Sequence, residues 1–169
     1  MEKGHDAKSE ILVEQPNAKL YVMEIDLASM ESVRKFAAKI NLEFSSLDLL
    51  VNNAGVMMPP FSLTDDGFEL QFQANYLVHF LLTGLLLRKL EAAPDAAVIS
   101  LSSLAHDWGD IYFHDLNFKD KYDKRKSYGQ SKLACLMFAY ELDRRFRAKN
   151  SPVKSLAAHP GISNTELSR

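Results

Sequence analysis

Two short apolar runs, each ending in small polar residues, constrain the fold of this chain most. Residues 47–51 and 96–101 consist mostly of leucine, valine, isoleucine and alanine, and they lead into Asn52-Asn53-Ala54-Gly55 and Ser102-Ser103. Apolar runs of this length, bounded by small polar residues, favour buried strands. In an open parallel sheet, ligands bind beyond the carboxyl ends of the strands. These two polar ends are therefore where we expect chemistry.

The rest of the chain alternates helical and strand patterns, as in a doubly wound α/β sheet. Its 169 residues are 47% hydrophobic and 25% charged, and no internal repeat or linker divides them, so we expect one domain over 1–169. Ser29 can cap a helix whose apolar residues recur at helical spacing. The expected helices cover 2–14, about 30–44, about 67–90 and about 126–149, and the expected strands cover 19–25, 47–52, 96–102 and 153–158.

Charge and cysteine content argue against several classes of function. A net charge of −2, with acidic residues scattered among the basic ones, argues against nucleic-acid binding, because phosphate contacts need a basic face. The longest apolar run, 76–87, is too short to cross a bilayer, so no membrane span is expected. The N-terminus lacks the apolar region of a signal peptide. The single cysteine, Cys135, has apolar neighbours and is interpreted as a buried, reduced thiol, from which a cytoplasmic location follows.

Tyr128 and Lys132 form the pair with the clearest chemical meaning. They are four residues apart, so on a helix they lie one turn from each other on the same face. A lysine ammonium beside a phenol stabilises the phenolate and lowers the tyrosine pKa from its ordinary value near 10. The pair therefore predicts a general acid/base. Taken alone, it could also be a tyrosine and a lysine at the edge of the core whose polar ends reach water.

Four motifs occur in the order that characterises one known family. They are Asn52-Asn53-Ala54-Gly55 after an apolar strand, a serine pair at the next strand end, Tyr128-x-x-x-Lys132 and Pro160-Gly161. Through them the chain resembles the short-chain dehydrogenase/reductase family over its whole length. Within that family it is most similar to the retinol-dehydrogenase-like branch, through the segments 64–69, 75–77, 79–83, 102–106, 131–134 and 159–161.

The resemblance implies an NAD(P)-dependent oxidoreductase that interconverts a small-molecule alcohol and its carbonyl compound. Tyr128 would exchange a proton with the substrate oxygen while hydride passes between substrate and nicotinamide. Lys132 would lower the tyrosine pKa and hold the nicotinamide ribose. Ser103, rather than Ser102, would hydrogen-bond the carbonyl oxygen. Asn75 matches a residue that supports a water relay behind the lysine, and an amide bonded to nearby backbone is the structural alternative.

The resemblance also assigns contacts to the cofactor, NAD or NADP. Asp26 matches the acid that meets the adenine ring, although a turn residue ahead of a helix explains it as well. Asn52, Ala54 and Gly55 would line the cofactor trough, and Asn52 would also tie adjacent strands together. The contacts to the nicotinamide carboxamide and phosphate would come from a turn that contains Pro160, Gly161 and Thr165.

One element of a dinucleotide fold is missing. Such folds hold the pyrophosphate on a glycine-rich turn between the first strand and its helix, because glycine lets backbone N–H groups approach the phosphates. The seven glycines form no such cluster and stand at positions 4, 55, 67, 84, 109, 129 and 161. We therefore expect an incomplete doubly wound, Rossmann-type parallel sheet that lacks its first strand–helix–strand unit and ends before the family's substrate lid. We also expect weak binding of NAD(P)H.

Two features depart from the family's usual pattern. Val78 stands where members of the branch usually have glycine, and a branched side chain there could push its helix away from its neighbours. The stretch between Ser103 and Tyr128 is longer than in the family's shorter form. Residues 111–118 match an insertion of the retinol-dehydrogenase-like branch, so the longer stretch supports that assignment.

Two other functions compete with this one. His106-Asp107 and His114-Asp115 could be metal ligands, but their spacing fits no helix face, and we expect no metal. Alternatively, the chain could be a catalytically inactive truncated homologue that acts as a dimerisation partner. The helices 67–90 and 126–149 often pair between subunits in this family, and the first is apolar nearly all round. We expect a homo-oligomer, with outward apolar positions such as Leu86 facing the partner.

Overall fold

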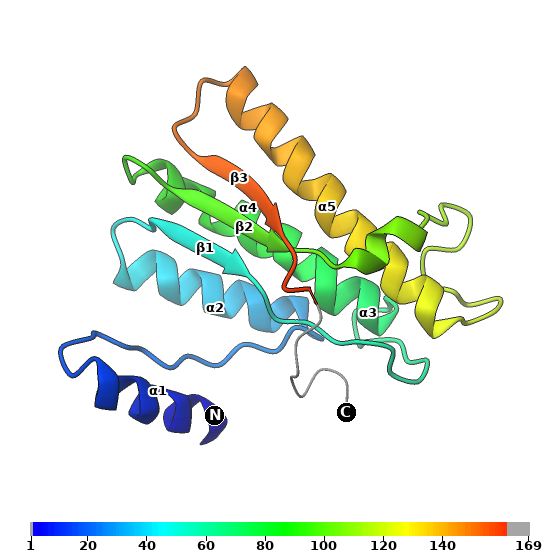
Figure 1. The fold of residues 1–169 in the computed structure, drawn as a ribbon, viewed down its shortest axis with the longest axis horizontal. Coiled ribbons are helices and arrows are strands. Elements are labelled where there is room, and N and C mark those ends of the chain that lie inside the picture. The colour runs from blue at the N-terminus through cyan, green and yellow to red at the C-terminus, as the bar shows by residue number, and fades with distance from the viewer. Residues whose placement is uncertain (1, 162–169) are drawn as a thin grey trace.

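Three parallel strands form the centre of the structure (Figure 1). The structure is a computed structural model that describes residues 2–161. They lie in the order β1-β2-β3, and helical segments link each strand to the next. The predicted α/β fold with a parallel sheet is confirmed. In chain order the elements are α1 (Glu2–Glu14), α2 (Met30–Glu43), β1 (Leu49–Asn52), α3 (Leu70–Phe72), the π-helical turn η1 (Gln73–Leu77), α4 (Val78–Glu91), β2 (Ala97–Leu101), the 3₁₀ helix η2 (Leu104–Trp108), α5 (Lys124–Ala148) and β3 (Lys154–Ala158).

The register of the sheet brings the polar strand ends together. β1 pairs with β2 so that Asn52 stands opposite Ser100, and β2 pairs with β3 so that Leu101 stands opposite Ala158. The pairing continues one residue further, where Ser102 N donates to the Ala158 carbonyl at 2.8 Å. Because the strands are parallel, their carboxyl ends lie at one edge of the sheet.

Apolar side chains from the helices pack against one face of the sheet. One cluster joins α2 to α4 and consists of Val33, Ala37, Val78, Leu82 and Leu86. A second cluster joins α4 and α5 to β2 and consists of Leu90, Ala93, Ala96, Val98, Phe146 and Val153. Burying a valine, leucine or phenylalanine contributes roughly 1.5–3 kcal/mol relative to leaving it exposed, so these clusters hold the helices on the sheet. On the other face, Leu49, Val51 and Leu156 are about half exposed.

The helix predicted for 67–90 begins three residues later and changes type along its length. Gly67 takes a φ of +83°, and the chain turns there before the Glu69 side chain caps the helix by accepting from Phe72 N at 2.9 Å. The π-helical turn η1 separates α3 from α4. Val78 follows this turn and is fully buried in the α2–α4 cluster, so its branched side chain forms part of the helix contact.

The helix predicted for 126–149 is α5, which starts two residues earlier. Asp123 explains the earlier start, because its carboxylate accepts from Arg125 N at 2.9 Å and from Lys126 N at 3.1 Å. The predicted cap at Ser29 is also present, and its hydroxyl accepts from Ser32 N at 3.2 Å.

The strand predicted for 19–25 does not form. This segment runs beside α2, apart from the sheet (Figure 1), and the ring of Tyr21 packs edge-on against Phe44 with 5.6 Å between ring centroids. A strand needs a neighbour that pairs with its N–H and C=O groups, and none of the strands within residues 2–161 lies beside this segment. A doubly wound sheet has the strand order 3-2-1-4-5-6, so its first and second strands lie between its third and its fourth. If residues 19–25 correspond to the third strand and β1 to the fourth, these two segments cannot pair with each other directly.

The expectation that Leu86 faces outward is wrong. Leu86 is 1% exposed because it lies on the α4 face that packs against α2. The outward apolar position on α4 is Phe80, which is 55% exposed.

The continuous helix from Leu70 to Glu91 is long and apolar enough to cross a membrane by length and composition alone. It is longer than the apolar run recognised in the sequence, and more than half of its most apolar stretch is buried inside the fold. A core helix of a soluble protein passes the same test, so this is weak support for a membrane span.

Candidate active site

Tyr128 and Lys132 lie in the first half of α5 and are both buried, at 5% and 7% exposure. The lysine Nζ lies 5.8 Å from the centre of the tyrosine ring and donates to the Leu101 carbonyl at 3.2 Å. Within residues 2–161 this carbonyl is its only hydrogen-bond acceptor, so two of the three ammonium N–H groups remain for a ligand or water. α5 thus places the pair at the carboxyl end of the central strand.

The two serines after β2 have different partners. Ser102 is buried, and its hydroxyl donates to the Lys132 carbonyl at 2.7 Å, which fixes α5 against the strand end. Ser103 Oγ accepts from Ala105 N at 3.2 Å and caps η2, and its hydroxyl also lies within hydrogen-bonding reach of the Tyr128 phenol. This arrangement agrees with the choice of Ser103 over Ser102 as the residue beside the tyrosine.

Burial dominates the protonation of the tyrosine–lysine pair. It raises the pKa of Tyr128, and the hydrogen bond with Ser103 opposes that rise. Burial also lowers the pKa of Lys132, because a low-dielectric surrounding disfavours the charged form. Lys132 is not among the groups that shift the Tyr128 pKa, so the lowering expected from its charge is absent in this structure, and the phenol is protonated at neutral pH.

The π-helical turn directs the Asn75 side chain at the loop after β1. Asn75 Oδ1 accepts from Val56 N at 2.8 Å, and its Nδ2 donates to the Val56 carbonyl at 3.0 Å and to Ser131 Oγ at 2.9 Å. A Cβ atom at Gly55 would lie 2.5 Å from Asn75 Oδ1 and 4.0 Å from Lys132 Nζ, so the loop requires glycine there. The amide thus holds the strand-end loop against α5, which is the structural alternative considered for Asn75. Its role in a water relay stays a prediction.

The backbone carbonyl of Asn75 meets two buried groups that can ionise. His79 Nδ1 donates to it at 2.9 Å, and Cys135 Sγ donates to it at 3.2 Å. Burial lowers the pKa of His79 to about 4, with a smaller effect of the Lys132 charge, whereas the hydrogen bond to Asn75 raises it. Burial raises the pKa of Cys135 to about 11. Both side chains are therefore neutral at pH 7, and Cys135 is the buried thiol that the sequence predicts.

Asn52 ties β1 to α4 rather than to the neighbouring strand. Its Nδ2 donates to Thr83 Oγ1 at 3.1 Å. Asn52 Oδ1 and Ser100 Oγ, opposite each other in the register, are buried without a hydrogen-bond partner in the described part of the chain. Since buried polar atoms nearly always have a partner, water or a ligand is expected at these strand ends. Ala54 lies exposed in the loop that follows.

Asp26, Pro160 and Gly161, which are further predicted cofactor residues, lie outside the helices and strands. Asp26 builds the turn before α2: its Oδ1 accepts from Ala28 N at 2.8 Å, and its backbone N–H donates to Ser32 Oγ at 2.9 Å. This supports the turn explanation, and its contact with adenine stays a prediction. Pro160 and Gly161 are exposed beyond β3, where Gly161 takes a φ of +71°. Thr165 falls outside the described residues.

The histidines of the two His-Asp pairs contact neighbouring groups of the protein. His106 Nδ1 donates to the Ser103 carbonyl at 2.6 Å, and its Nε2 lies 3.1 Å from Asp107 Oδ1. His114 is exposed, and its ring contacts Tyr112. Over residues 2–161, no three histidine, cysteine, aspartate or glutamate side chains are grouped so that they could hold a metal ion.

Asn75 was predicted from the sequence, but the other buried polar residues at 69–75 were missed by the sequence interpretation. Glu69, Gln71, Gln73 and Asn75 are all 0–1% exposed. They stand at every second position of an otherwise apolar segment, in a helix where the apolar period is 3.6. Polar residues at every second position cannot all lie on one exposed face of a helix, so this spacing could have indicated that they are buried and hydrogen-bonded.

The strand-end site suits the nicotinamide ribose half of a dinucleotide. Gly55 leaves bare backbone near Lys132, whose N–H groups can donate to ribose hydroxyls, and Asn52 Oδ1 is an unpaired acceptor. The pyrophosphate half finds no glycine-rich turn among residues 2–161. The described residues therefore fit one half of such a cofactor.

Known proteins are similar to this chain in sequence. The family model for short chain dehydrogenases matches residues 1–169. Human retinol dehydrogenase 13 is 49% identical over 170 residues, which cover 100% of this chain and 51% of that protein. Mouse retinol dehydrogenase 12 is 45% identical over 167 residues, which cover 99% of this chain and 52% of that protein. The chain thus spans about half the length of the curated relatives it matches.

Solved structures share the fold. An uncharacterized protein from Mycobacterium paratuberculosis has a TM-score of 0.80 and 44% identity, and the match covers 95% of this chain and 57% of that one. An NADPH-bound carbonyl reductase from chicken fatty liver has a TM-score of 0.64 and 25% identity, and the match covers 92% of this chain and 62% of that one. From its sequence match and its fold, this chain belongs to the short-chain dehydrogenase family.

Proposed function

We propose that the protein is an NAD(P)-dependent oxidoreductase that interconverts an alcohol and a carbonyl compound, with Tyr128 as general acid/base. The observation that carries this proposal is the meeting of Ser103, Tyr128 and Lys132 at the carboxyl end of β2, although they come from two elements separated in sequence. Retinol and retinaldehyde are the first substrates to test, because relatives carry the name retinol dehydrogenase.

In the reductive direction, Tyr128 donates its phenolic proton to the substrate oxygen as that oxygen gains charge. Ser103 donates a second hydrogen bond to the same oxygen and stabilises the charge. Lys132 keeps its ammonium near the phenol, so that the phenolate left behind is stabilised. A bound nicotinamide cofactor supplies the hydride. The raised pKa of Tyr128 favours this direction, because the acid must hold its proton until the substrate arrives.

Cofactor contacts follow from the same edge of the sheet. Lys132, Asn52 and Gly55 would hold the nicotinamide ribose, with Ala54 beside them. Asp26 would reach the adenine, and the turn with Pro160, Gly161 and Thr165 would reach the carboxamide and phosphate. The choice between NAD and NADP is tested by titrating the purified protein with NADH and NADPH and following nucleotide fluorescence.

Removing the phenolic oxygen tests the central assignment. In a form of the protein that also carries a pyrophosphate-binding turn, Tyr128→Phe keeps the ring and its packing, so turnover of retinaldehyde with NADPH or NADH should fall by at least about 10² while the melting temperature changes little. Tyr21→Phe is the matched control, because it removes a tyrosine hydroxyl from an exposed ring outside the site. Turnover of Tyr128→Phe equal to that of the control would refute the assignment.

Lys132→Met tests the role of the ammonium. Without the cation the phenolate is less stable, so the alkaline limb of the pH–rate profile should move to higher pH as turnover falls. A limb that stays in place would leave Lys132 as a ribose contact alone.

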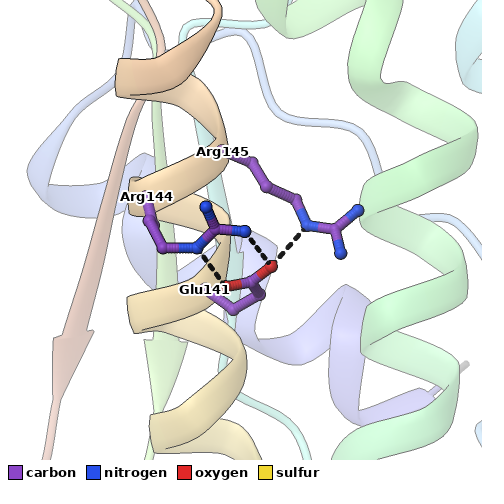
Figure 2. A network of polar contacts seen from close by, with 3 residues as sticks. All are labelled: Glu141, Arg144 and Arg145. Carbon is purple, nitrogen blue, oxygen red and sulfur yellow. Dashed lines mark hydrogen bonds and ion pairs between the residues drawn. The ribbon is translucent and has the colours of Figure 1, made fainter.

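A second copy of the chain is the partner that we propose for the outer face of α4 and α5. Three rings meet there: Phe80 and Phe138 have centroids 5.4 Å apart, and Tyr76 lies 6.3 Å from both. Phe80 is 55% exposed, so this aromatic group offers apolar surface. One turn along α5, Glu141 accepts hydrogen bonds from Arg144 and Arg145 (Figure 2). An apolar centre beside a polar border is the usual composition of a subunit interface.

A charge at Phe80 tests this association. Phe80→Glu should convert oligomers into monomers, because an unpaired charge cannot be buried cheaply. Leu42→Glu on α2 is the control, since Leu42 is 88% exposed and lies on another helix. Light scattering that shows a monomer before any substitution would refute the proposal.

The cytoplasmic location expected from the sequence stays a prediction.

A further inference from the structure

The first turns of α5 are attached to the segment 69–75 by hydrogen bonds that involve three of its buried side chains. Glu69 Oε2 accepts from Ser127 Oγ at 2.7 Å, Gln71 Nε2 donates to the Lys124 carbonyl at 3.1 Å, and Asn75 Nδ2 donates to Ser131 Oγ at 2.9 Å. We call these three bonds the polar seam. The seam spans the part of α5 that carries Tyr128 and Lys132.

The seam is one of the attachments that set how α5 is rotated about its own axis, and it is the one that involves Ser127, next to Tyr128. Ser127 and Ser131 are four residues apart and therefore lie on one face of the helix. Tyr128 and Lys132 each follow one of these serines, about 100° further round the helix. Bonds at Lys132 and Cys135 also hold the later turns of α5, whereas the bond at Ser127 holds the turn in which Tyr128 lies. Loss of the Ser127 bond would therefore let this turn shift and redirect the phenol.

Glu69 stabilises its own helix as the N-terminal cap, but a cap does not require the second bond that its carboxylate makes to α5. Its side chain is 0% exposed, and its Oε1 is buried without a hydrogen-bond partner among the described residues. A buried acceptor without a partner costs free energy, so an apolar residue at this position would avoid that cost. Of the two bonds that Oε2 accepts, the one from Phe72 N caps the helix that begins at Leu70, and the one from Ser127 joins that helix to α5.

We propose that Glu69 is a positioning residue for the reaction at Tyr128, and that it acts through Ser127 by fixing the rotation of α5 so that the phenol meets Ser103. This inference rests on the proposed function. It extends that function to a residue that need not contact either substrate or cofactor, and it predicts that loss of the Glu69–Ser127 bond slows the chemical step without weakening cofactor binding.

Four substitutions separate this role from a structural one. Glu69→Ala and Ser127→Ala each remove one end of the bond. Glu69→Gln keeps an acceptor for Ser127, so it should restore turnover. Gln73→Ala is the matched control: Gln73 is equally buried on the same segment, but it bonds Thr64 and Asp66 and makes no bond to α5.

In the form of the protein that also carries a pyrophosphate-binding turn, with NADPH and retinaldehyde as probes, Glu69→Ala and Ser127→Ala should each lower kcat by roughly 10-fold or more, because small misplacements of a catalytic group can cost up to about 10²-fold. The KM for NADPH should stay unchanged, and the double variant should be no slower than the single ones, since both remove the same bond. The alkaline limb of the pH–rate profile should move to higher pH, because Tyr128 loses its contact with Ser103. Gln73→Ala should lower the melting temperature and leave kcat and the limb in place.

The outcomes distinguish this proposal from the proposed function. If Tyr128→Phe abolishes turnover but Ser127→Ala and Glu69→Ala match Gln73→Ala in kcat and pH profile, the positioning role is refuted and the proposed function stands. If Tyr128→Phe retains turnover, the proposed function is refuted first. If Glu69→Ala does not fold, Ser127→Ala decides alone, since serine to alanine within a helix is well tolerated.

Discussion

Acid should destabilise this protein through His79. The side chain is 7% exposed, and its pKa of about 4 lies well below the ordinary value of 6.5. The folded state therefore binds the imidazole proton more weakly than the unfolded chain does. The stability that His79 contributes is fully present above pH 6.5, is lost progressively as the pH falls to 4, and changes no further below that.

The size of the effect follows from the two pKa values. The interval from 6.5 to about 4, at about 1.36 kcal/mol for each pH unit, corresponds to about 3 kcal/mol of unfolding free energy. Most of this loss should have occurred by pH 4.5. That is a large fraction of the 5–15 kcal/mol typical of a whole domain.

Urea unfolding at pH 7.5 and pH 4.5, followed by circular dichroism, measures the loss. His79→Asn removes the titrating ring while its amide can still donate to the Asn75 carbonyl, so this variant should lose about 2.5 kcal/mol less between the two pH values than the wild type. His114→Asn, at an exposed loop position, is the control and should behave like the wild type. If His79→Asn and the wild type lose equal free energy, the reasoning from burial is wrong.

Three further predictions concern single side chains. Gly55→Ala should destabilise the protein by about 1–3 kcal/mol in urea unfolding, because the new Cβ meets Asn75 Oδ1 at 2.5 Å. Gly84→Ala, with open space around its Cβ, should stabilise the protein by about 0.5–1 kcal/mol. If Gly84→Ala were the less stable variant, the close approach of Gly55 to Asn75 would be contradicted. Cys135 should react with a thiol reagent at pH 8 only after unfolding, because its pKa is about 11 and it is 4% exposed, and rapid labelling of the native protein would disprove this. The Glu141 carboxylate should titrate near pH 2 in a carbon-13 NMR experiment, because Arg144 and Arg145 hydrogen-bond it (Figure 2), and it should return toward its ordinary value of 4.5 when both arginines are replaced by methionine.

The sequence predicted the parts of this fold that depend on local pattern. The strands at 47–52, 96–102 and 153–158 and the cap at Ser29 were found because apolar runs and capping residues act over a few neighbours. The strand at 19–25 was predicted from the same kind of pattern and does not form, because a strand also depends on a partner that local pattern does not reveal. Leu86 was misplaced for a related reason: a helix that is apolar on all sides does not show which side faces α2.

The candidate site was predicted in its composition but only partly in its physical chemistry. Motif order brought together Ser103, Tyr128 and Lys132, because the carboxyl ends of parallel strands share one edge. The pKa of Tyr128 is raised, whereas a lowered pKa was predicted, because the sequence shows the neighbouring charge but not the depth of burial. The contact between Asn52 and Thr83 was equally hidden, since it depends on how β1 is set against α4.

Because of the π-helical turn at 73–77, the number of residues in this helix matters as much as which residues they are. A π turn holds one residue more than an α turn, and each residue advances a helix by about 100°. Residues before the turn thus direct their polar groups at α5, while residues after it direct leucines and valines at α2. Deleting one residue here would let the segment become a regular α-helix, but the two halves would then be out of phase. Such a deletion should be more damaging than any single substitution within the turn, because it would turn every bond of the polar seam away from α5 at once.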